Sequence, residues 1–136
     1  MEPLTAAALL FCSTAQPGPY PPASAVVDAF VQAYNRQDAK GIAAVVSQDA
    51  VILRGDQRLD GDELARNYRD NLFTMPSPYR FKVKNRLAQD NIVAETEFYT
   101  GGEEGEPPET ILSVYEVKGG CIVRILASDP GDAEGD

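Results

Sequence analysis

Apolar and polar positions alternate most regularly between residues 80 and 99, where the two kinds follow each other with a period of two. This alternation predicts two antiparallel strands joined by a turn, with one face buried and the other in solvent. The turn falls within residues 88–91, on Gln89-Asp90 or on Asp90-Asn91. Because directly opposed residues share a face, either turn leaves every residue on the same side of the hairpin.

The two faces of this predicted hairpin differ in composition. Phe81 and Phe98 share the mostly apolar face, which we expect to be buried beneath helices. The other face is mostly charged, and on it Lys82 and Lys84 lie across from Glu95 and Glu97. Two neighbouring carboxylates could form an acid/base site, but lysines opposite them are typical of a solvated charge ladder. We therefore interpret this face as the outer surface.

Helical spacing dominates the first half of the chain. Apolar residues that recur every three or four positions predict three amphipathic helices, over residues 24–35, 38–46 and 60–73. Ser24 and Asp38 are suitable N-caps for the first two. Asp60-Gly61-Asp62 begins the third, with acids at its positive end. A short strand over residues 50–53 separates the second helix from the third.

The C-terminal part of the chain predicts more sheet. A hairpin over residues 110–127 turns at Lys118-Gly119-Gly120, after an exposed loop over residues 101–108. Either Gly-Gly alone or all three residues form this turn, and the choice, which decides the face of Arg124 and Ile125, stays open. Helices followed by strands predict an α+β domain, in which a curved antiparallel sheet packs on three helices and encloses a pocket.

The domain is predicted to occupy residues 24–128, with three flanking segments. Residues 1–16 carry a short apolar run and then small residues, which resemble an export signal, although no Lys or Arg precedes the run. The alternative is a disordered leader. Residues 17–23 are a proline-rich linker, and residues 129–136 a disordered acidic tail. An export signal would direct the domain to the periplasm or outside the cell, and a leader would leave it in the cytoplasm.

The composition of the chain limits the classes of molecule that it is expected to bind. The formal net charge is −9, but most of it lies in the 101–108 loop region and the tail. We interpret this acidity as solvation, and it argues against nucleic acid or an anionic membrane as partner. The apolar run is too short to span a bilayer. We expect a small, mainly apolar or amphipathic molecule, and a second copy of the chain, as partners.

Composition also limits the chemistry. The chain has no histidine, so it lacks the commonest general base and metal ligand. Cys12 and Cys121 cannot form a zinc site, and their positions do not suggest a disulfide, so we expect Cys121 to be a small apolar residue. Acids crowd residues 56–63 without the spacing of a calcium loop, and we interpret them as helix caps. No cofactor and no metal are predicted.

Three strings carry a resemblance to a known family: VVDAFVQAYNRQDAKGIAAVVSQDAVI, LDGDELARNYRDNLF and ILSVYEVKGGCIVRI. They resemble the opening helix pair, the third helix and the final hairpin of the nuclear-transport-factor-2-like superfamily, in its SnoaL-like and ketosteroid-isomerase-like branch. The resemblance implies a cone-shaped fold with a pocket at its open end, and frequent dimers. Its members include isomerases, cyclases, dehydratases, hydrolases and non-catalytic binding proteins, so fold alone decides little about function.

The resemblance allows the isomerase chemistry to be examined residue by residue. Such an enzyme uses a carboxylate base, and a Tyr with a protonated Asp that hold the oxyanion, a case that is itself a standard example of pKa tuning. In this chain the Tyr position matches Phe30, the base position matches Arg54 and the acid position matches Ser113. None of the three can take the original role. The resemblance therefore predicts no catalytic residue of that mechanism.

The remaining candidates line a predicted ligand pocket: Phe30, Tyr34, Arg54, Tyr68, Ser113, Tyr115 and Ile125. Arg54 would suit an anionic group on the ligand if it points inward, although a strand end could also leave it in solvent. Three functions stay open. We favour a non-catalytic cup for a small molecule over a SnoaL-like enzyme that uses pocket tyrosines and Arg54, and over a homodimeric structural module. A buried carboxylate in the pocket would favour the enzyme.

Overall fold

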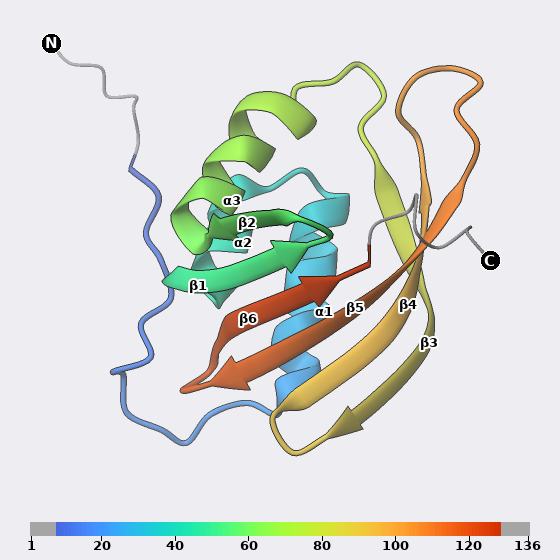
Figure 1. Ribbon diagram of the computed structural model, residues 1–136. Coiled ribbons are helices and arrows are strands. Elements are labelled where there is room, and N and C mark those ends of the chain that lie inside the picture. The colour runs from blue at the N-terminus through green and yellow to red at the C-terminus, as the bar shows by residue number, and fades with distance from the viewer. Residues whose placement is uncertain (1–7, 129–136) are drawn as a thin grey trace, which may run out of the picture.

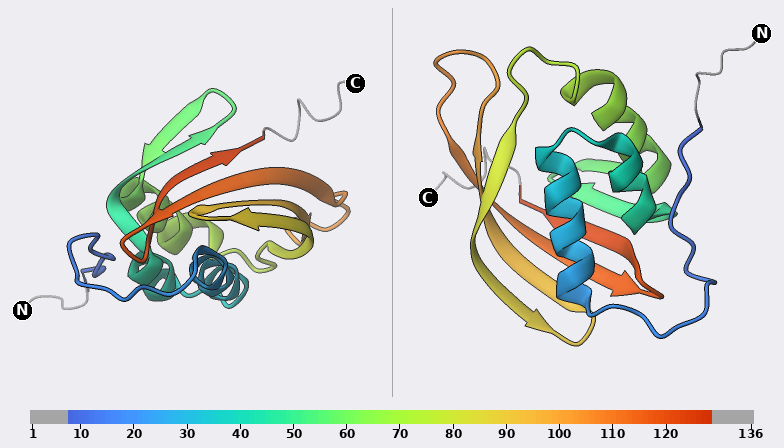
Figure 2. Two further views of the ribbon diagram at one scale, coloured as in Figure 1. Left: turned by 90° about the horizontal axis from the view of Figure 1, so that it is seen from below. Right: turned by 180° about the vertical axis from the view of Figure 1, so that it is seen from behind.

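The computed structural model describes residues 8–128, which form three helices, a π-helical turn and one six-stranded sheet (Figure 1). In chain order the elements are α1 (Ala23–Asn35), α2 (Ala39–Val45), β1 (Val46–Arg54), β2 (Gln57–Asp60), α3 (Gly61–Asn67), η1 (Tyr68–Leu72), β3 (Arg80–Gln89), β4 (Ile92–Thr100), β5 (Glu109–Lys118) and β6 (Cys121–Ala127). The helices lie along one face of the curved sheet, and no described element covers the other (Figure 2). The predicted α+β class is confirmed.

The strands follow the order β2-β1-β6-β5-β4-β3 across the sheet. Strands β3 to β6 form an antiparallel meander, and β1 pairs antiparallel with β2. The expectation of an entirely antiparallel sheet is wrong at one place, because β1 and β6 run parallel. The meander reverses direction three times between β3 and β6, so β6 runs opposite to β3 and lies parallel to β1.

Local signals explain most helix boundaries. Asp38 accepts a hydrogen bond from the Gly41 N–H at 3.0 Å and begins α2. Asp60 and Glu63 form a reciprocal capping box at α3, which agrees with reading these acids as caps. The expected N-cap of the first helix is wrong. Pro22, not Ser24, precedes α1, and no side chain caps that helix.

The second predicted helix is also shorter than expected. It ends at Val45, and Val46 is the first residue of β1, where its side chain is fully buried. β1 is accordingly longer than the predicted strand and reaches Arg54. The third helix changes into the π-helical turn η1 at Tyr68, which widens the helix and sets this tyrosine over the sheet.

The β3–β4 hairpin turns at Asp90-Asn91 and contains a bulge that reverses the predicted faces. The register shifts between Val83 and Asn85, so that Phe81 pairs with Tyr99 and Phe98 pairs with Lys82. One extra residue in a strand moves its partner by one position, and a one-residue shift exchanges the two faces. Phe81 is buried as predicted, but the face of β4 that accompanies it carries the glutamates. The predicted outer charge ladder is wrong.

The final hairpin turns on Gly119-Gly120 alone. Both glycines have positive φ angles, 58° and 80°, and Lys118 pairs with Cys121. This register, with a shift after Glu116, buries Ile125 and leaves Arg124 exposed. Glu116 and Arg124 lie directly opposite each other on the sheet.

A disulfide joins Cys12 to Cys121, with 5.8 Å between their Cα atoms. The expectation that these cysteines do not pair is wrong, because the fold brings together residues 109 positions apart. The Cys12 N–H also donates to the carbonyl oxygens of Ala43, at 2.9 Å, and Val46, at 3.1 Å. Residues 8–22 therefore run along the domain. The predicted acidic tail and residues 1–7 lie outside the described residues. Among residues 8–128, no helix is long and apolar enough to cross a membrane.

Candidate functional site

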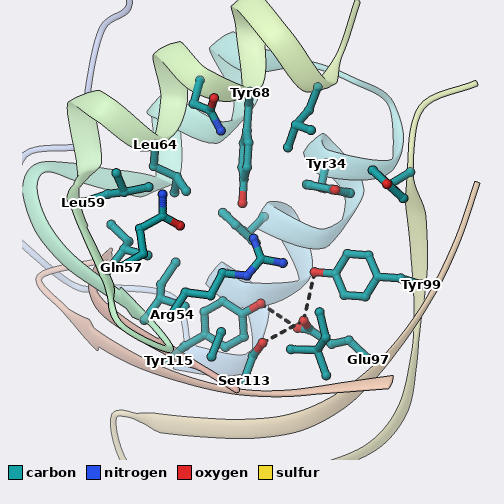
Figure 3. Close-up of a pocket in the computed structure, with 18 of the residues that line it drawn as sticks. Tyr34, Arg54, Gln57, Leu59, Leu64, Tyr68, Glu97, Tyr99, Ser113 and Tyr115 are labelled. Atoms are coloured by element: carbon teal, nitrogen blue, oxygen red, sulfur yellow. Dashed lines mark hydrogen bonds between the residues drawn. The ribbon is translucent and has the colours of Figure 1, made fainter. Parts of the chain in front are cut away.

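A cavity of about 210 Å³ lies between the helices and the sheet (Figure 3). All seven residues predicted as a ligand pocket line it: Phe30, Tyr34, Arg54, Tyr68, Ser113, Tyr115 and Ile125. They come from α1, β1, η1, β5 and β6, so the fold gathers them from five elements. The wall also includes residues that the sequence did not indicate, among them Gln57, Leu64, Asn67, Tyr79, Glu97, Tyr99 and Glu109.

Glu97 is the residue that sequence reasoning missed. Its side chain is 0% exposed, and three hydroxyls donate hydrogen bonds to its carboxyl oxygens. Oε1 accepts from Ser113 at 2.8 Å and from Tyr99 at 3.2 Å, and Oε2 accepts from Tyr115 at 2.6 Å (Figure 3). The expectation that Glu95 and Glu97 form an exposed ladder is therefore wrong. A signal was present in Val93 and Tyr99, which share the face of the glutamates and are apolar or aromatic.

Burial changes the protonation of Glu97. The pKa of this carboxyl is raised to about 8, chiefly by desolvation, and the neighbouring Glu95 acts in the same direction. Hydrogen bonds from Tyr115 and Ser113 act in the opposite direction, because they stabilise the carboxylate. Burial is the stronger effect. Glu97 is thus largely a neutral carboxylic acid at pH 7, able to donate a hydrogen bond or a proton.

Glu95 lies two residues earlier on the same inward face and is 1% exposed. Its Oε1 accepts hydrogen bonds from Arg86 Nε at 2.9 Å and forms an ion pair with Nη2 at 2.8 Å. The turn sets Arg86 opposite Glu95, and the bulge further along β3 places this pair on the same face as the buried Phe81. Arg86 also pairs with Asp28 of α1 at 2.7 Å.

Aromatic rings form the upper wall of the cavity. Tyr34 packs at its ring edge against Tyr68, with centroids 5.3 Å apart, and also contacts Phe73, Phe81 and Tyr99. Burial raises the pKa of Tyr34 to about 12 and raises the pKa of Tyr68, so both hydroxyls keep their protons and can donate to a ligand. These rings belong to the hydrophobic core and also form the cavity wall. A structural role and a role in the pocket therefore do not exclude each other.

Arg54 ends β1 and directs its guanidinium into the cavity, between Tyr68 and Glu97 (Figure 3). Its positive charge opposes the effect of burial on the pKa values of Tyr34 and Tyr68. Among the described residues it forms no ion pair, and the residue is exposed to solvent at the end of the strand. The cavity therefore has a cationic group that is free to meet an anion.

The three isomerase positions acquire a structural explanation. Phe30 packs against Tyr115, with ring centroids 5.6 Å apart, and donates nothing. Ser113, which the resemblance matches to the acid position, donates to Glu97 on the adjacent strand. A neutral carboxyl is therefore present beside that position, supplied by β4 in place of β5. No cluster of potential metal ligands occurs among residues 8–128.

The fold and the cavity define a class of α+β cones with an internal pocket, and comparison with known proteins supplies the family. The model of the SnoaL-like domain matches residues 27–125, so this chain belongs to the SnoaL-like family. The curated proteins contain no match.

Several solved structures share this fold. An epoxide hydrolase of the LEH-like kind from M. tuberculosis is 20% identical, with a TM-score of 0.70 over 78% of this chain and 80% of that one. IdmH, a proposed polyketide cyclase from Streptomyces antibioticus, is 20% identical, with a TM-score of 0.64 over 77% and 89%. A proposed ketosteroid isomerase from Kribbella flavida is 16% identical, with a TM-score of 0.67 over 78% and 76%. At these identities the likeness shows the fold alone.

Proposed function

We propose that this chain is a SnoaL-like enzyme that catalyses proton transfer on a small, mainly apolar carbonyl compound. The observation that carries the proposal is Glu97, a carboxyl that lines the cavity, is shielded from water and has a raised pKa. Strongly perturbed acids in a cavity are typical of catalytic sites. The preference for a non-catalytic cup rested on the absence of such a group, so the proposal moves from the cup to the enzyme.

Glu97 acts in this proposal as a general acid. The Tyr99 hydrogen bond to Glu97, at 3.2 Å, is the longest of its three, so a substrate oxygen can most easily take the place of this hydroxyl. The carboxyl then donates its proton to the carbonyl oxygen, while water removes a proton from the neighbouring carbon. An enol forms, and reversal of the two transfers regenerates the acid.

Tyr34, Tyr68 and Arg54 hold the rest of the substrate. The two hydroxyls remain protonated and face the same space as the guanidinium (Figure 3). A second, anionic group on the substrate would meet Arg54, and the aromatic wall would pack against its carbon skeleton. No cofactor is part of this proposal.

Deuterium exchange tests the proposal without knowledge of the natural substrate. Small cyclic ketones and keto acids are incubated with the protein in D₂O, and NMR measures deuterium incorporation next to the carbonyl. We expect exchange with the natural chain and at least a hundredfold loss in Glu97→Gln, within the usual range for general acid catalysis. Glu116→Gln, on the outer face, is the matched control. Ligands that bind without exchange, or exchange that Glu97→Gln retains, would refute the enzyme.

A non-catalytic binding cup is the second candidate, and a specific observation favours it. Both oxygens of Glu97 are already engaged, and the position of the isomerase base holds Arg54. The same NMR samples distinguish the two functions, because a cup gives ligand shifts but no exchange. Native mass spectrometry of freshly purified protein would identify a molecule that co-purifies.

We also propose that the outer face of the sheet forms a homodimer. An apolar row crosses four strands on this face, because Leu87 pairs with Ala94, Ala94 with Val114 and Val114 with Leu126. Leu87 and Leu126 are exposed, and the exposed Leu112 lies beside the row on β5. Contiguous exposed apolar surface of this kind is typical of interfaces. Sedimentation velocity over a range of concentrations tests the dimer, and a monomer at all of them would refute it.

The disulfide bears on the compartment. Such bonds form and persist in oxidising surroundings, so we propose that the domain functions in the periplasm or outside the cell. Removal of residues 1–16 would remove Cys12, so a chain that keeps the disulfide has not lost this segment as a cleaved signal. Mass spectrometry after alkylation, with and without prior reduction, tests this on protein from the source cells. Alkylation of both thiols before reduction would contradict it.

A further inference from the structure

The inward face of β4 carries one carboxylate that the proposed reaction does not use. Glu95 is as buried as Glu97, and its Oε1 is held by Arg86. Its Oε2 is also buried, and it has no hydrogen-bond partner among the described residues. A buried acceptor without a donor is costly and needs an explanation.

Glu97 provides the missing donor. Both side chains leave the same buried face of one strand two residues apart, and Glu95 is among the groups that raise the pKa of Glu97. Two carboxylates can only accept, so a hydrogen bond between them requires a proton. One proton between the two groups satisfies Glu95 Oε2 without any further partner.

The number of charged groups around Glu95 and Glu97 also favours one proton between the two carboxyls. Two buried carboxyls, Glu95 and Glu97, face a single guanidinium, that of Arg86, which also pairs with the exposed Asp28. The other groups around Glu97 are Tyr99 on its own strand, Tyr115 and Ser113 from β5, Tyr34 from α1, Tyr68 from η1 and Arg54 from β1. A second buried negative charge on Glu97 would have no ion-pair partner among the described residues, because Arg54 forms no ion pair.

We propose that Glu95 and Glu97 share one proton, and that Glu95, fixed by Arg86, is the positioning residue that keeps Glu97 neutral and directed at the cavity. The pair then carries one negative charge, which lies on the side of Arg86, away from the ligand. The arrangement resembles the paired carboxylates of aspartic proteases in its physical cause, because two close carboxyls cannot both ionise.

The shared proton also determines the class of ligand, a consequence that rests on the proposed function. With Glu97 neutral, the charge of Arg54 is uncompensated inside the cavity. With Glu97 ionised, the two charges would offset each other and an anion would be repelled by the carboxylate. The cavity therefore takes an apolar molecule with one negative charge, and takes it best while the pair holds its proton.

Carbon-13 NMR of the glutamate carboxyl groups tests the shared proton directly. In wild-type protein at pH 6.5 we expect one glutamate carbon at the position of a protonated acid, and its loss in Glu97→Gln. In Glu95→Gln the neighbouring charge is gone, so the midpoint of this signal moves to lower pH. Glu116→Gln leaves the midpoint unchanged. Full ionisation of every glutamate at pH 6.5, or an unmoved midpoint in Glu95→Gln, would overturn the proposal.

Ligand binding tests the consequence separately. Benzoate and its neutral analogue benzamide serve as probes, and NMR titrations measure their affinities at pH 6.5 and pH 9.5. We expect benzoate to bind on the order of tenfold more weakly at the higher pH in wild-type protein, and equally at both in Glu97→Gln. Benzamide binding as tight as that of benzoate would refute the ligand class. The carboxyl spectra would still decide the shared proton, and the exchange assay would still decide catalysis.

Discussion

The two faces of β4 reverse the usual relation between polarity and burial. Its inward face holds Glu95 and Glu97, which are titratable and buried, whereas its outward face holds Ala94 in an apolar row that ends at the exposed Leu87. In most half-exposed strands the apolar side faces the core. Such a reversal is unfavourable for stability by itself. It is explained if the inner face serves chemistry in the cavity and the outer face meets a second copy of the chain.

The largest expected effect comes from removing the cation on the inner face. Arg86→Met leaves Glu95 buried with no positive partner, and we expect a loss of about 3–5 kcal/mol in the free energy of unfolding at pH 7.5. Urea denaturation measures it.

Lys82→Met is the control for this measurement. Lys82 lies on the same strand but is exposed, and it forms no ion pair with a described residue. We expect its unfolding free energy to match that of wild type. Equal effects of the two substitutions would contradict the contrast between the faces, because the inner position would then matter no more than the outer one.

A second effect is the pH dependence that Glu97 imposes on stability. Its pKa is raised in the folded chain from 4.5 to about 8, so between these values the folded state binds more protons than the unfolded state. Stability therefore falls as pH rises through this window and levels off above it. Relative to Glu97→Gln, we expect wild type to lose on the order of a few kcal/mol between pH 4.5 and pH 8.

Denaturation of both proteins across this window gives the difference directly. Every other titrating group occurs in both, so its contribution cancels in the comparison unless it contacts residue 97. A difference that stays constant with pH would show that Glu97 has the same pKa in both states. The inner face of β4 would then be an ordinary buried surface rather than a proton-holding one.

The sequence predicted the fold because its local signals agree with one another. Asp38 and the pair Asp60 and Glu63 begin helices where helical spacing begins, and Gly119-Gly120 turns a hairpin where alternation predicts one. The seven predicted pocket residues line one cavity because the resemblance aligned whole elements, which tolerates small errors of register.

The catalytic candidate could not be predicted, because it depends on one bulge. A period-two pattern divides the residues of each strand between two faces. It does not say which face of one strand lies on the same side of the sheet as which face of the next. The register shift between Val83 and Asn85 decides that match, and neither residue is a glycine or proline that would signal it. The Cys12–Cys121 disulfide was missed for a related reason, since its partners meet only in the tertiary fold.

The smallest expected effect on unfolding concerns the outer face. Leu112 is 49% exposed beside the apolar row, so Leu112→Lys should change the free energy of unfolding of the monomer by about 0.5 kcal/mol or less. The same substitution places a charge in the proposed dimer interface and should weaken association by at least tenfold, as sedimentation velocity measures it. Leu10→Lys is the matched control, because Leu10 is 83% exposed but lies in the N-terminal segment, and it should leave association unchanged. If Leu112→Lys destabilises the monomer strongly, this face is part of the core and the contrast across β4 fails; if it leaves a dimer intact, the second copy binds elsewhere.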